Sequence, residues 1–401
     1  MSSNSFQNAI TLSTPQIVDK INSATLAQFG LIPNLQYTYT VKQFGATGDG
    51  STSDDAAIAT AVAAAISDGK PLYFPPGTYK LTATSTTVWD LKNAVKKGVK
   101  FFGAGIGRTV LNFAGATTGI ALQIGSTTTP TPADSYDFSL ADMSITGSLA
   151  GVLVCVGYND YRDPLNCLNF TGVGVFNGIN NSNAVALRLN YVLNSNFIGC
   201  RANCYANGTG TNAGTSLECR QAAFNTFTNG SYGNAYYGIR FKDGSSFGNV
   251  FTGCDIENIN YGVKTDSSSS GNNTVIGGQF SLWETAAVST TGSLATNAVT
   301  IINPNIADND ADPFIDPTNF SGIRLIDGTG VAAPAVPATG ATVANTTGKR
   351  VLVTFWGGSI TKATVSGFDI GISTGSVVVK HGESISLTYT GSPVWIWKAL
   401  E

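Results

Sequence analysis

Apolar residues recur along the middle of the chain at a long and nearly constant interval. Short segments such as FNTFTNG and GNVFTGC repeat one pattern, with an apolar residue at the same place in each. The spacings between successive members are 25, 27, 30, 24, 24 and 26 residues. A period of this length is typical of coils that cannot bury their apolar face alone and therefore stack on one another. The recurring positions are Ile145, Phe170, Phe197, Phe227, Phe251, Val275 and Ile301.

A second set of segments follows the same period and alternates apolar with charged residues. Because side chains alternate along a strand, their apolar residues are predicted to point inward and their charged residues outward. The matching segments are LRL (187–189), LEC (217–219), IRF (239–241) and VKT (263–265). Two columns with one period indicate a parallel β-helix, with coils from about Leu81 to about Ile326. A further column, Asn225, Asn249 and Asn273, is predicted to stack as a ladder of asparagines.

The segment Val41–Tyr79, VKQFGATGDGSTSDDAAIATAVAAAISDGKPLYFPPGTY, has a different pattern of turn, helix and short strand. Asp54 stands where a helix N-cap belongs, Asp55 follows in the first turn, and Gly69 ends the helix. The segment resembles the N-terminal cap of the pectate-lyase-like superfamily of right-handed parallel β-helices, found in phage tailspikes and polysaccharide depolymerases. The resemblance implies an all-β, right-handed, single-stranded parallel β-helix with an N-terminal capping helix. It also implies that the cap carries no chemistry.

The two ends of the chain differ from the coils. Residues 328–347 are rich in Ala, Pro, Thr and Gly and are predicted to be a linker. Beyond them, residues 348–401 alternate apolar and polar positions between glycine turns, as a small β-sandwich or β-prism does. A module this small is expected to bury further apolar surface by associating with copies of itself, so it is predicted to be a trimerisation domain. Residues 1–36 are predicted to attach the protein to a virion, and residues 37–327 to form the β-helix.

Composition removes several classes of function. Charged residues make up only 12% of the chain and the net charge is −3, so no basic field indicates nucleic acid. No apolar run approaches the roughly 20 residues that span a membrane. The six cysteines form no CxxC pair and the chain has one histidine, so we expect no metal and no other cofactor. The cysteines are expected to be buried free thiols of a protein made in a reducing host cytoplasm.

Two carboxylates that face one side of a strand are the best candidates for catalysis. In CDIEN, Asp255 and Glu257 lie two residues apart, which places their Cα atoms roughly 6.5–7 Å apart on a strand. Hydrolysis of a glycosidic bond needs such a pair, one as acid and one as base or nucleophile. The alternative is that both are solvated turn carboxylates. Glu218 is a second catalytic candidate, either as an acid or base on a strip that grips an anionic glycan or as one member of a charge ladder.

Aromatic and charged residues near these carboxylates are the candidates for substrate binding. Trp283 follows about one coil after Asp255 and could stack on a sugar ring. A polar loop between Ile145 and Phe170 is equally compatible with binding and with a solvated connection between coils. The binding candidates are Arg240, Trp283, Glu284, Tyr237, Tyr261, Tyr158, Tyr161 and Arg162.

These features favour a homotrimeric phage tailspike that binds and hydrolyses a bacterial capsule or O-antigen. In that interpretation the N-terminus joins the phage tail or baseplate. One alternative is an adhesin that binds a glycan without shortening it. The other is a polysaccharide lyase, with Arg240, Lys264 or a tyrosine as the base. The motifs of polygalacturonases and of classical pectate lyases are not recognisable in the chain.

Overall fold

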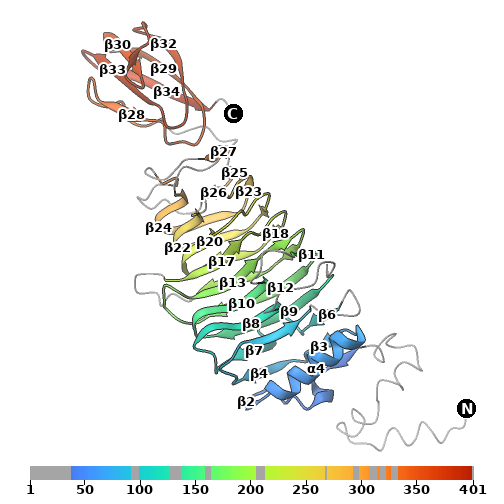
Figure 1. The fold of residues 1–401 in the computed structure, drawn as a ribbon. Coiled ribbons are helices and arrows are strands. Elements are labelled where there is room, and N and C mark those ends of the chain that lie inside the picture. Colours follow the sequence, from blue (N-terminus) through green and yellow to red (C-terminus); the bar gives the residue numbers. More distant parts are fainter. Residues whose placement is uncertain are drawn as a thin grey trace, which may run out of the picture.

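The structure is a computed structural model. It describes residues 38–91, 99–126, 137–158, 164–204, 213–266, 269–291, 298–306, 314–316, 322–326 and 333–399. In these residues, 25 strands are joined by parallel pairing into one elongated stack (Figure 1). The predicted all-β fold with a long parallel β-helix is therefore confirmed. The segment 1–36, with its predicted role in attachment, lies outside the described residues.

Each coil contributes strands to three stacks, which we call ladders A, B and C. Ladder A consists of β1 (Tyr39–Thr40), β3 (Leu72–Tyr73), β6 (Lys100–Phe102), the first parts of β9 (Ser139–Gly147) and β12 (Asn169–Asn177), β15 (Asn196–Ile198), β18 (Thr226–Thr228), β21 (Val250–Thr252), β23 (Asn273–Ile276), β25 (Val299–Ile302) and β27 (Ile323–Ile326). Ladder B consists of β2 (Asp49–Ser53), β4 (Gly77–Leu81), β7 (Thr109–Phe113), the second parts of β9 and β12, β16 (Arg201–Cys204), β19 (Ser231–Gly233), the first parts of β22 (Asp255–Thr265) and β24 (Gln279–Thr290), and β26 (Asn305–Ile306).

Ladder C consists of β5 (Thr87–Asp90), β8 (Thr118–Ser126), β10 (Ala150–Tyr158), β13 (Val185–Asn190), β17 (Thr215–Arg220), β20 (Ala235–Phe241) and the second parts of β22 and β24. A short parallel pair, β11 (Leu165–Asn166) and β14 (Val192–Leu193), lies between ladders C and A along the chain. The parallel pairing already includes β1, so the stack begins well before Leu81, where the first coil was expected.

The predicted register holds through the middle of the stack, with one correction. Phe197 pairs with Phe227, and Phe227 with Phe251, as the repeat predicts. The residue that precedes Phe170 in this column is Leu140, however, and not Ile145. The long strand β9 serves two ladders, so it carries two inward-facing apolar residues that fit the period about equally well. Ile145 is the one on ladder B.

A stack of phenylalanine rings runs through the core along ladder A. The ring centroids lie 5.1 Å apart between Phe170 and Phe197, 4.7 Å between Phe197 and Phe227, and 4.2 Å between Phe227 and Phe251. The rings of the last two pairs are nearly parallel, with angles of 11° and 5° between their planes. Offset stacking of this kind adds about 0.5–1.5 kcal/mol per pair beyond the area that each ring buries. The core is therefore continuous from coil to coil.

The predicted asparagine ladder is present at the turn that leads into ladder A. Asn225 donates its side-chain N–H to Oδ1 of Asn249 at 3.0 Å, and Asn249 donates to Oδ1 of Asn273 at 2.8 Å. The same oxygens accept backbone N–H groups of the preceding coil. All three side chains are buried, so these bonds satisfy groups that water cannot reach.

The cap closes the N-terminal end of the stack with a 3₁₀ turn, η2 (Val41–Phe44), and one α-helix, α4 (Asp55–Asp68). Asp54 is the N-cap residue, as predicted, but its carboxylate does not bond the helix amides. It accepts the backbone N–H of Thr47 at 2.6 Å, while Asp55 accepts the backbone N–H of Thr82 at 2.8 Å. Both carboxylates therefore join the helix start to neighbouring segments, which is a structural role.

The C-terminal module is a sandwich of two antiparallel sheets. One sheet contains β28 (Thr342–Ala344), β30 (Ile360–Val365), β31 (Phe368–Asp369) and β33 (Ser384–Tyr389). The other contains β29 (Val351–Gly357), β32 (Gly375–Val379) and β34 (Pro393–Ala399). The sandwich begins before residue 348, because β28 pairs with β33 and Trp395 donates to the carbonyl of Pro334. Part of the segment predicted as a linker thus belongs to this module.

Five of the six cysteines are buried free thiols, as expected, whereas Cys167 is exposed. Burial raises the pKa of Cys155 and of Cys200 to about 11, so these thiols stay protonated. In the part of the chain that the structure describes, no helix has the length and apolar character needed to cross a bilayer.

The asparagine ladder gives a direct test of how the coils are held together. Replacing Asn249 by alanine leaves buried donors and acceptors of two neighbouring coils unsatisfied. We expect this to lower the free energy of unfolding by about 1–3 kcal/mol for each group left without a partner. Denaturant unfolding followed by circular dichroism measures the change.

The matched control is Asn196→Ala, because Asn196 is exposed and, among the described residues, its side chain donates to Oδ1 of Asn169 in the preceding coil at 3.1 Å. Its loss should change the free energy of unfolding by no more than a few tenths of a kcal/mol, since water replaces the bond. Equal effects of the two substitutions would contradict a structural role for the buried ladder.

Candidate functional site

Asp255 and Glu257 lie on the outer side of ladder B, at the start of β22. Ile256 between them is fully buried, while both acidic side chains are partly exposed. Residues two apart on a strand are about 6.6 Å apart at Cα. The two carboxyl groups therefore share one face, as the alternation in CDIEN predicts.

The surroundings of Asp255 favour its protonated form. Burial raises the pKa of the Asp255 carboxyl, and the nearby Glu257 carboxylate raises it further. Among the described residues, Oδ1 of Asp255 is buried and has no hydrogen-bond partner. A carboxyl whose pKa is raised and which has an oxygen without a partner is suited to act as a general acid.

Ladder C carries the charged column that the sequence predicts. Arg188 pairs in register with Glu218, Glu218 with Arg240, and Arg240 with Lys264. The column therefore brings together residues that lie more than twenty positions apart in the chain. It crosses four strands: β13, β17, β20 and β22.

Glu218 sits at the centre of this column and is only 2% exposed. Its Oε1 accepts from Nε of Arg188 at 2.6 Å and from Nε of Arg220 at 2.7 Å. Burial alone would raise the pKa of Glu218, but the two guanidinium groups outweigh it and hold the pKa below its usual value. A carboxylate clamped in this way does not exchange protons readily, so this geometry favours the charge-ladder alternative over catalysis.

A groove of about 370 Å³ opens beside Glu218. Four basic side chains and one acidic side chain line it, so its lining is mainly basic in a chain with few charges, although Glu218, Asp243 and Asp266 pair with three of the four basic groups. The sequence interpretation missed two of the basic residues, Arg220 and Lys242, although Arg220 lies two positions after Glu218 on the same face of β17. The charged residues of the groove are Arg188, Glu218, Arg220, Arg240 and Lys242.

Tyrosine rings lie beside the basic groups of the same ladder. The guanidinium of Arg240 lies 4.2 Å from the ring centroid of Tyr237 and also donates to Asp266 at 2.6 Å. The Tyr237 ring stacks on Tyr261 at 5.8 Å. These contacts hold a cationic and aromatic surface on the outer side of β20 and β22.

Other predicted binding residues lie elsewhere. Trp283 is 3% exposed and packs its ring against the edge of Phe314, so the expected stacking on a sugar is wrong. Glu284 is exposed and accepts the side-chain N–H of Asn260 at 2.8 Å. The side chain of Tyr158, together with Tyr161 and Arg162, lies outside the described residues.

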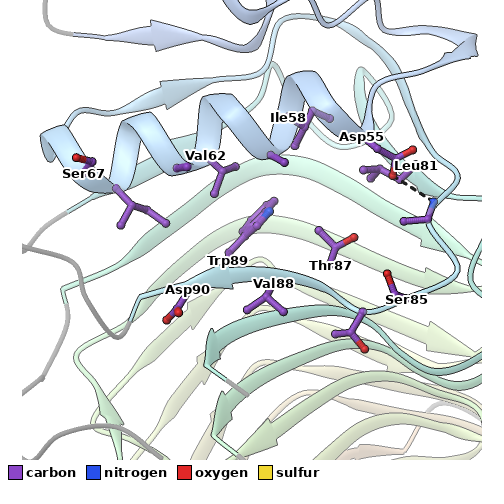
Figure 2. Close-up of a pocket in the computed structure, with 15 residues that line it drawn as sticks. Asp55, Ile58, Val62, Ser67, Leu81, Ser85, Thr87, Val88, Trp89 and Asp90 are labelled. Atoms are coloured by element: carbon purple, nitrogen blue, oxygen red, sulfur yellow. Dashed lines mark hydrogen bonds between the residues drawn. The ribbon is translucent and has the colours of Figure 1, made fainter. Parts of the chain in front are cut away.

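Another groove belongs to the cap and measures about 520 Å³. Figure 2 shows it between α4 and β5, with Ile58, Val62 and Trp89 directed toward it. Asp55 lies at one end, where hydrogen bonds to Thr82 and Ala83 occupy its carboxylate. Its lining is mainly apolar, and the groove carries no cluster of groups suited to acid–base chemistry. The described residues also contain no group of three or more side chains able to hold a metal ion.

The clamp on Glu218 predicts a dependence of stability on pH. Because the folded-state pKa of Glu218 is depressed, its contribution is present above the ordinary value of 4.5 and is lost as pH falls through the folded-state pKa. Glu218→Gln should cost about 3 kcal/mol at neutral pH, since it leaves two guanidinium groups without their anion. The variant should also lack the part of the wild-type loss of stability below pH 4.5 that comes from Glu218, while Asp55, whose pKa is lowered as well, keeps its own part.

Urea unfolding across that pH range measures both effects. Asp369→Asn is the control, because Asp369 is 55% exposed and its ion pair with Lys362 is long, at 3.8 Å. A Glu218→Gln variant as stable as this control would contradict the clamp.

Comparison with known proteins gives a family match near the start of the chain and matches to curated proteins over less than a third of it. Residues 39–149 match the family described as rhamnogalacturonase A/epimerase, pectate lyase-like. A mannuronan C5-epimerase of Azotobacter vinelandii, AlgE6, is 33% identical over 117 residues, which are 29% of this chain and 13% of that protein. Alginate lyase 7 of the same organism is 33% identical over 115 residues, 27% of this chain and 13% of that protein. The chain thus spans only about an eighth of the length of these relatives.

Solved structures of similar shape have low identity. Pectate lyase Pel9A has a TM-score of 0.48 at 15% identity, covering 68% of this chain and 70% of its own. ORF18 of Geobacillus virus E2 has a TM-score of 0.45 at 16% identity, covering 92% and 78%. Both scores lie below 0.5, so these two likenesses carry no inference about this chain. The expected resemblance to the pectate-lyase-like superfamily is confirmed by the family match over residues 39–149.

Proposed function

We propose that the protein binds a bacterial surface polysaccharide along the outer side of its β-helix and hydrolyses it with Asp255 and Glu257. The observation that carries this proposal is the pair of carboxyl groups on one face of β22, in which the pKa of Asp255 is raised. Two neighbouring carboxyl groups in different protonation states are what acid–base hydrolysis of a glycoside requires.

The roles of the two carboxyl groups follow from their surroundings. Asp255, which keeps its proton more readily, donates it to the glycosidic oxygen as the bond from the anomeric carbon to that oxygen breaks. Glu257, as the carboxylate, either activates the attacking water or attacks the anomeric carbon itself. A separation of about 6.5–9.5 Å between the carboxyl groups suits the first route, and about 5–5.5 Å suits the second.

The basic groove of ladder C supports an acidic polysaccharide as the substrate. Arg188, Arg220 and Lys242 line the groove, and because Arg188 and Arg220 share the one carboxylate of Glu218, this part of the lining keeps an excess of basic groups that an acidic chain would meet. Two relatives, which match 29% and 27% of the chain, are named for mannuronan and for alginate, which supports a polysaccharide as the ligand. The family match ends at residue 149, so it does not reach Asp255.

The hypothesis of a phage tailspike is part of this proposal. In it the protein is a homotrimer, its C-terminal sandwich joins the subunits, and residues 1–36 attach it to the phage tail. The small sandwich with its own core supports the role of that module, because it would bury further apolar surface on association.

A lyase is the second candidate, and one observation favours it. Burial lowers the pKa of Lys264, whose ammonium group lies 4.9 Å from the ring centroid of Tyr261. An amine with a lowered pKa is a better base for abstracting a proton beside a uronate carboxyl group. This route would leave an unsaturated product that absorbs in the ultraviolet.

Cleavage of surface polysaccharides from a panel of bacterial hosts tests the proposal. Asp255→Asn and Glu257→Gln should each lower the rate by about 10²–10⁴-fold, the range for loss of an acid or base, and leave binding intact. Size-exclusion chromatography follows product length, and absorbance follows unsaturated ends. Asp369→Asn, in the sandwich, is the matched control and should cleave at the wild-type rate.

The possible outcomes separate the candidates. Short products without absorbance, lost in both variants, support hydrolysis by the pair. Products that absorb in the ultraviolet and still form in Asp255→Asn would overturn the hydrolase proposal in favour of a lyase. Binding without any shortening by the wild-type protein would leave an adhesin and overturn the enzymatic proposal.

A further inference from the structure

A second surface with unusual chemistry lies at the turn between ladders C and A. Successive coils place Tyr191, Phe224 and Phe247 there, around a pocket of about 300 Å³. Phe224 is 54% exposed and Phe247 is 38% exposed. Neighbouring large aromatic rings that remain open to water are uncommon on a surface, and they are typical of binding sites.

The backbone at Phe224 makes this exposure more informative. Phe224 has a φ of +57°, in the left-handed region. The equivalent turn residues of neighbouring coils are Asn194, Gly248 and Asn272, with φ values of +49°, +67° and +53°. Asparagine and glycine tolerate this conformation, whereas a phenylalanine is strained in it. Because the ring is mostly exposed, burial offsets little of that strain, so Phe224 does not serve the stability of the coil.

The neighbouring coil holds the Phe224 ring in a defined position. Its centroid lies 5.0 Å from that of Phe247, with the rings at 86°. Gly248 lies directly beneath it, since a Cβ at that position would be 2.8 Å from Cδ1 of Phe224. The ring is thus a preformed flat platform at the mouth of the pocket.

A polar group in the pocket lacks a partner. Oε1 of Gln221 is buried and accepts no hydrogen bond from the described residues. Arg220, which precedes Gln221, lines the basic groove and lies 3.4 Å from Asp243 in an ion pair. The pocket therefore adjoins the basic groove at Arg220. Because Oε1 is closed to solvent, the half-buried Gln221 side chain must turn before it can accept a hydrogen bond from a ligand hydroxyl group.

We propose that this pocket is a saccharide-binding subsite, in which one pyranose ring lies on Phe224 and the Gln221 side chain turns so that Oε1 accepts a hydroxyl hydrogen of the sugar. An aromatic face next to a buried acceptor matches a sugar ring, which has an apolar C–H face and hydroxyl groups at its edge. The subsite goes beyond the proposed hydrolysis and does not depend on it, because it contains neither Asp255 nor Glu257.

Ligand-observed NMR by saturation transfer tests this with the full chain. The probes are the methyl pyranosides of glucose, galactose, mannose, N-acetylglucosamine, rhamnose and glucuronic acid. The wild-type protein should transfer saturation to at least one of them. Phe224→Asn should weaken that binding about tenfold, as expected for loss of an aromatic contact, while Phe224→Tyr should retain it.

Phe224→Asn also separates binding from folding, because asparagine suits this turn and should give a melting temperature equal to or above the wild-type value. Leu282→Asn is the matched control, since Leu282 is 48% exposed with a φ of +52° at a different turn. It should bind the probes as the wild-type protein does. Asp255→Asn should also bind them, so failure of the catalytic proposal is distinguishable.

Three results would overturn the subsite. The first is no transfer to any probe, and the second is equal binding by Phe224→Asn and wild type. The third is a change of oligomeric state in Phe224→Asn, seen by sedimentation, with probe binding unchanged. That last result would show that the aromatic patch contacts a second copy of the chain.

Discussion

Each coil of this protein depends on the coils on either side of it for its buried contacts. A ring such as Phe227 is buried only because Phe197 and Phe251 lie in register with it, 4.7 and 4.2 Å away. The same register fixes the outer surface, since residues that are level inside are also level outside. It brings Glu218 against Arg188, and the charge of the groove follows from packing in the core. The surface chemistry is in this sense a product of the interior.

Much of this register could be read from the sequence, and the exceptions have physical reasons. In LRL and LEC a charged residue lies between two apolar ones, and strand alternation points it away from the core when they point inward. The column through Arg188 and Glu218 could therefore be predicted. Trp283 was misplaced because Leu282 before it adopts a left-handed conformation, which interrupts the alternation of side chains and turns the indole inward. Ile145 was misplaced because one strand serves two ladders. The repeat pattern encodes neither the left-handed conformation of Leu282 nor the length of the strand that carries Ile145.

The candidate sites differ in how far they can be predicted from the sequence. Asp255 and Glu257 flank Ile256 on one strand, and strand alternation alone puts them on one face. The clamp on Glu218 needs the structure, because its two guanidinium partners come from different coils. The aromatic pocket is harder still, since Phe224 and Phe247 belong to turns, where no period fixes the direction of a side chain. Sites on strands are therefore visible in a repeat sequence, whereas sites on its turns are not.

The spacing of the asparagine ladder has a consequence for the length of the molecule. Asn225, Asn249 and Asn273 are separated by 24 residues each, with no insertion between the coils. If residues 225–248 were absent, Asn249 would follow Phe224 and meet Ser195, which now bonds Asn225. A whole coil is thus a unit that such a gene could gain or lose in one step. The distance between the helical cap and the terminal sandwich can then change in evolution in steps of one coil height, while the remaining coils keep their own contacts.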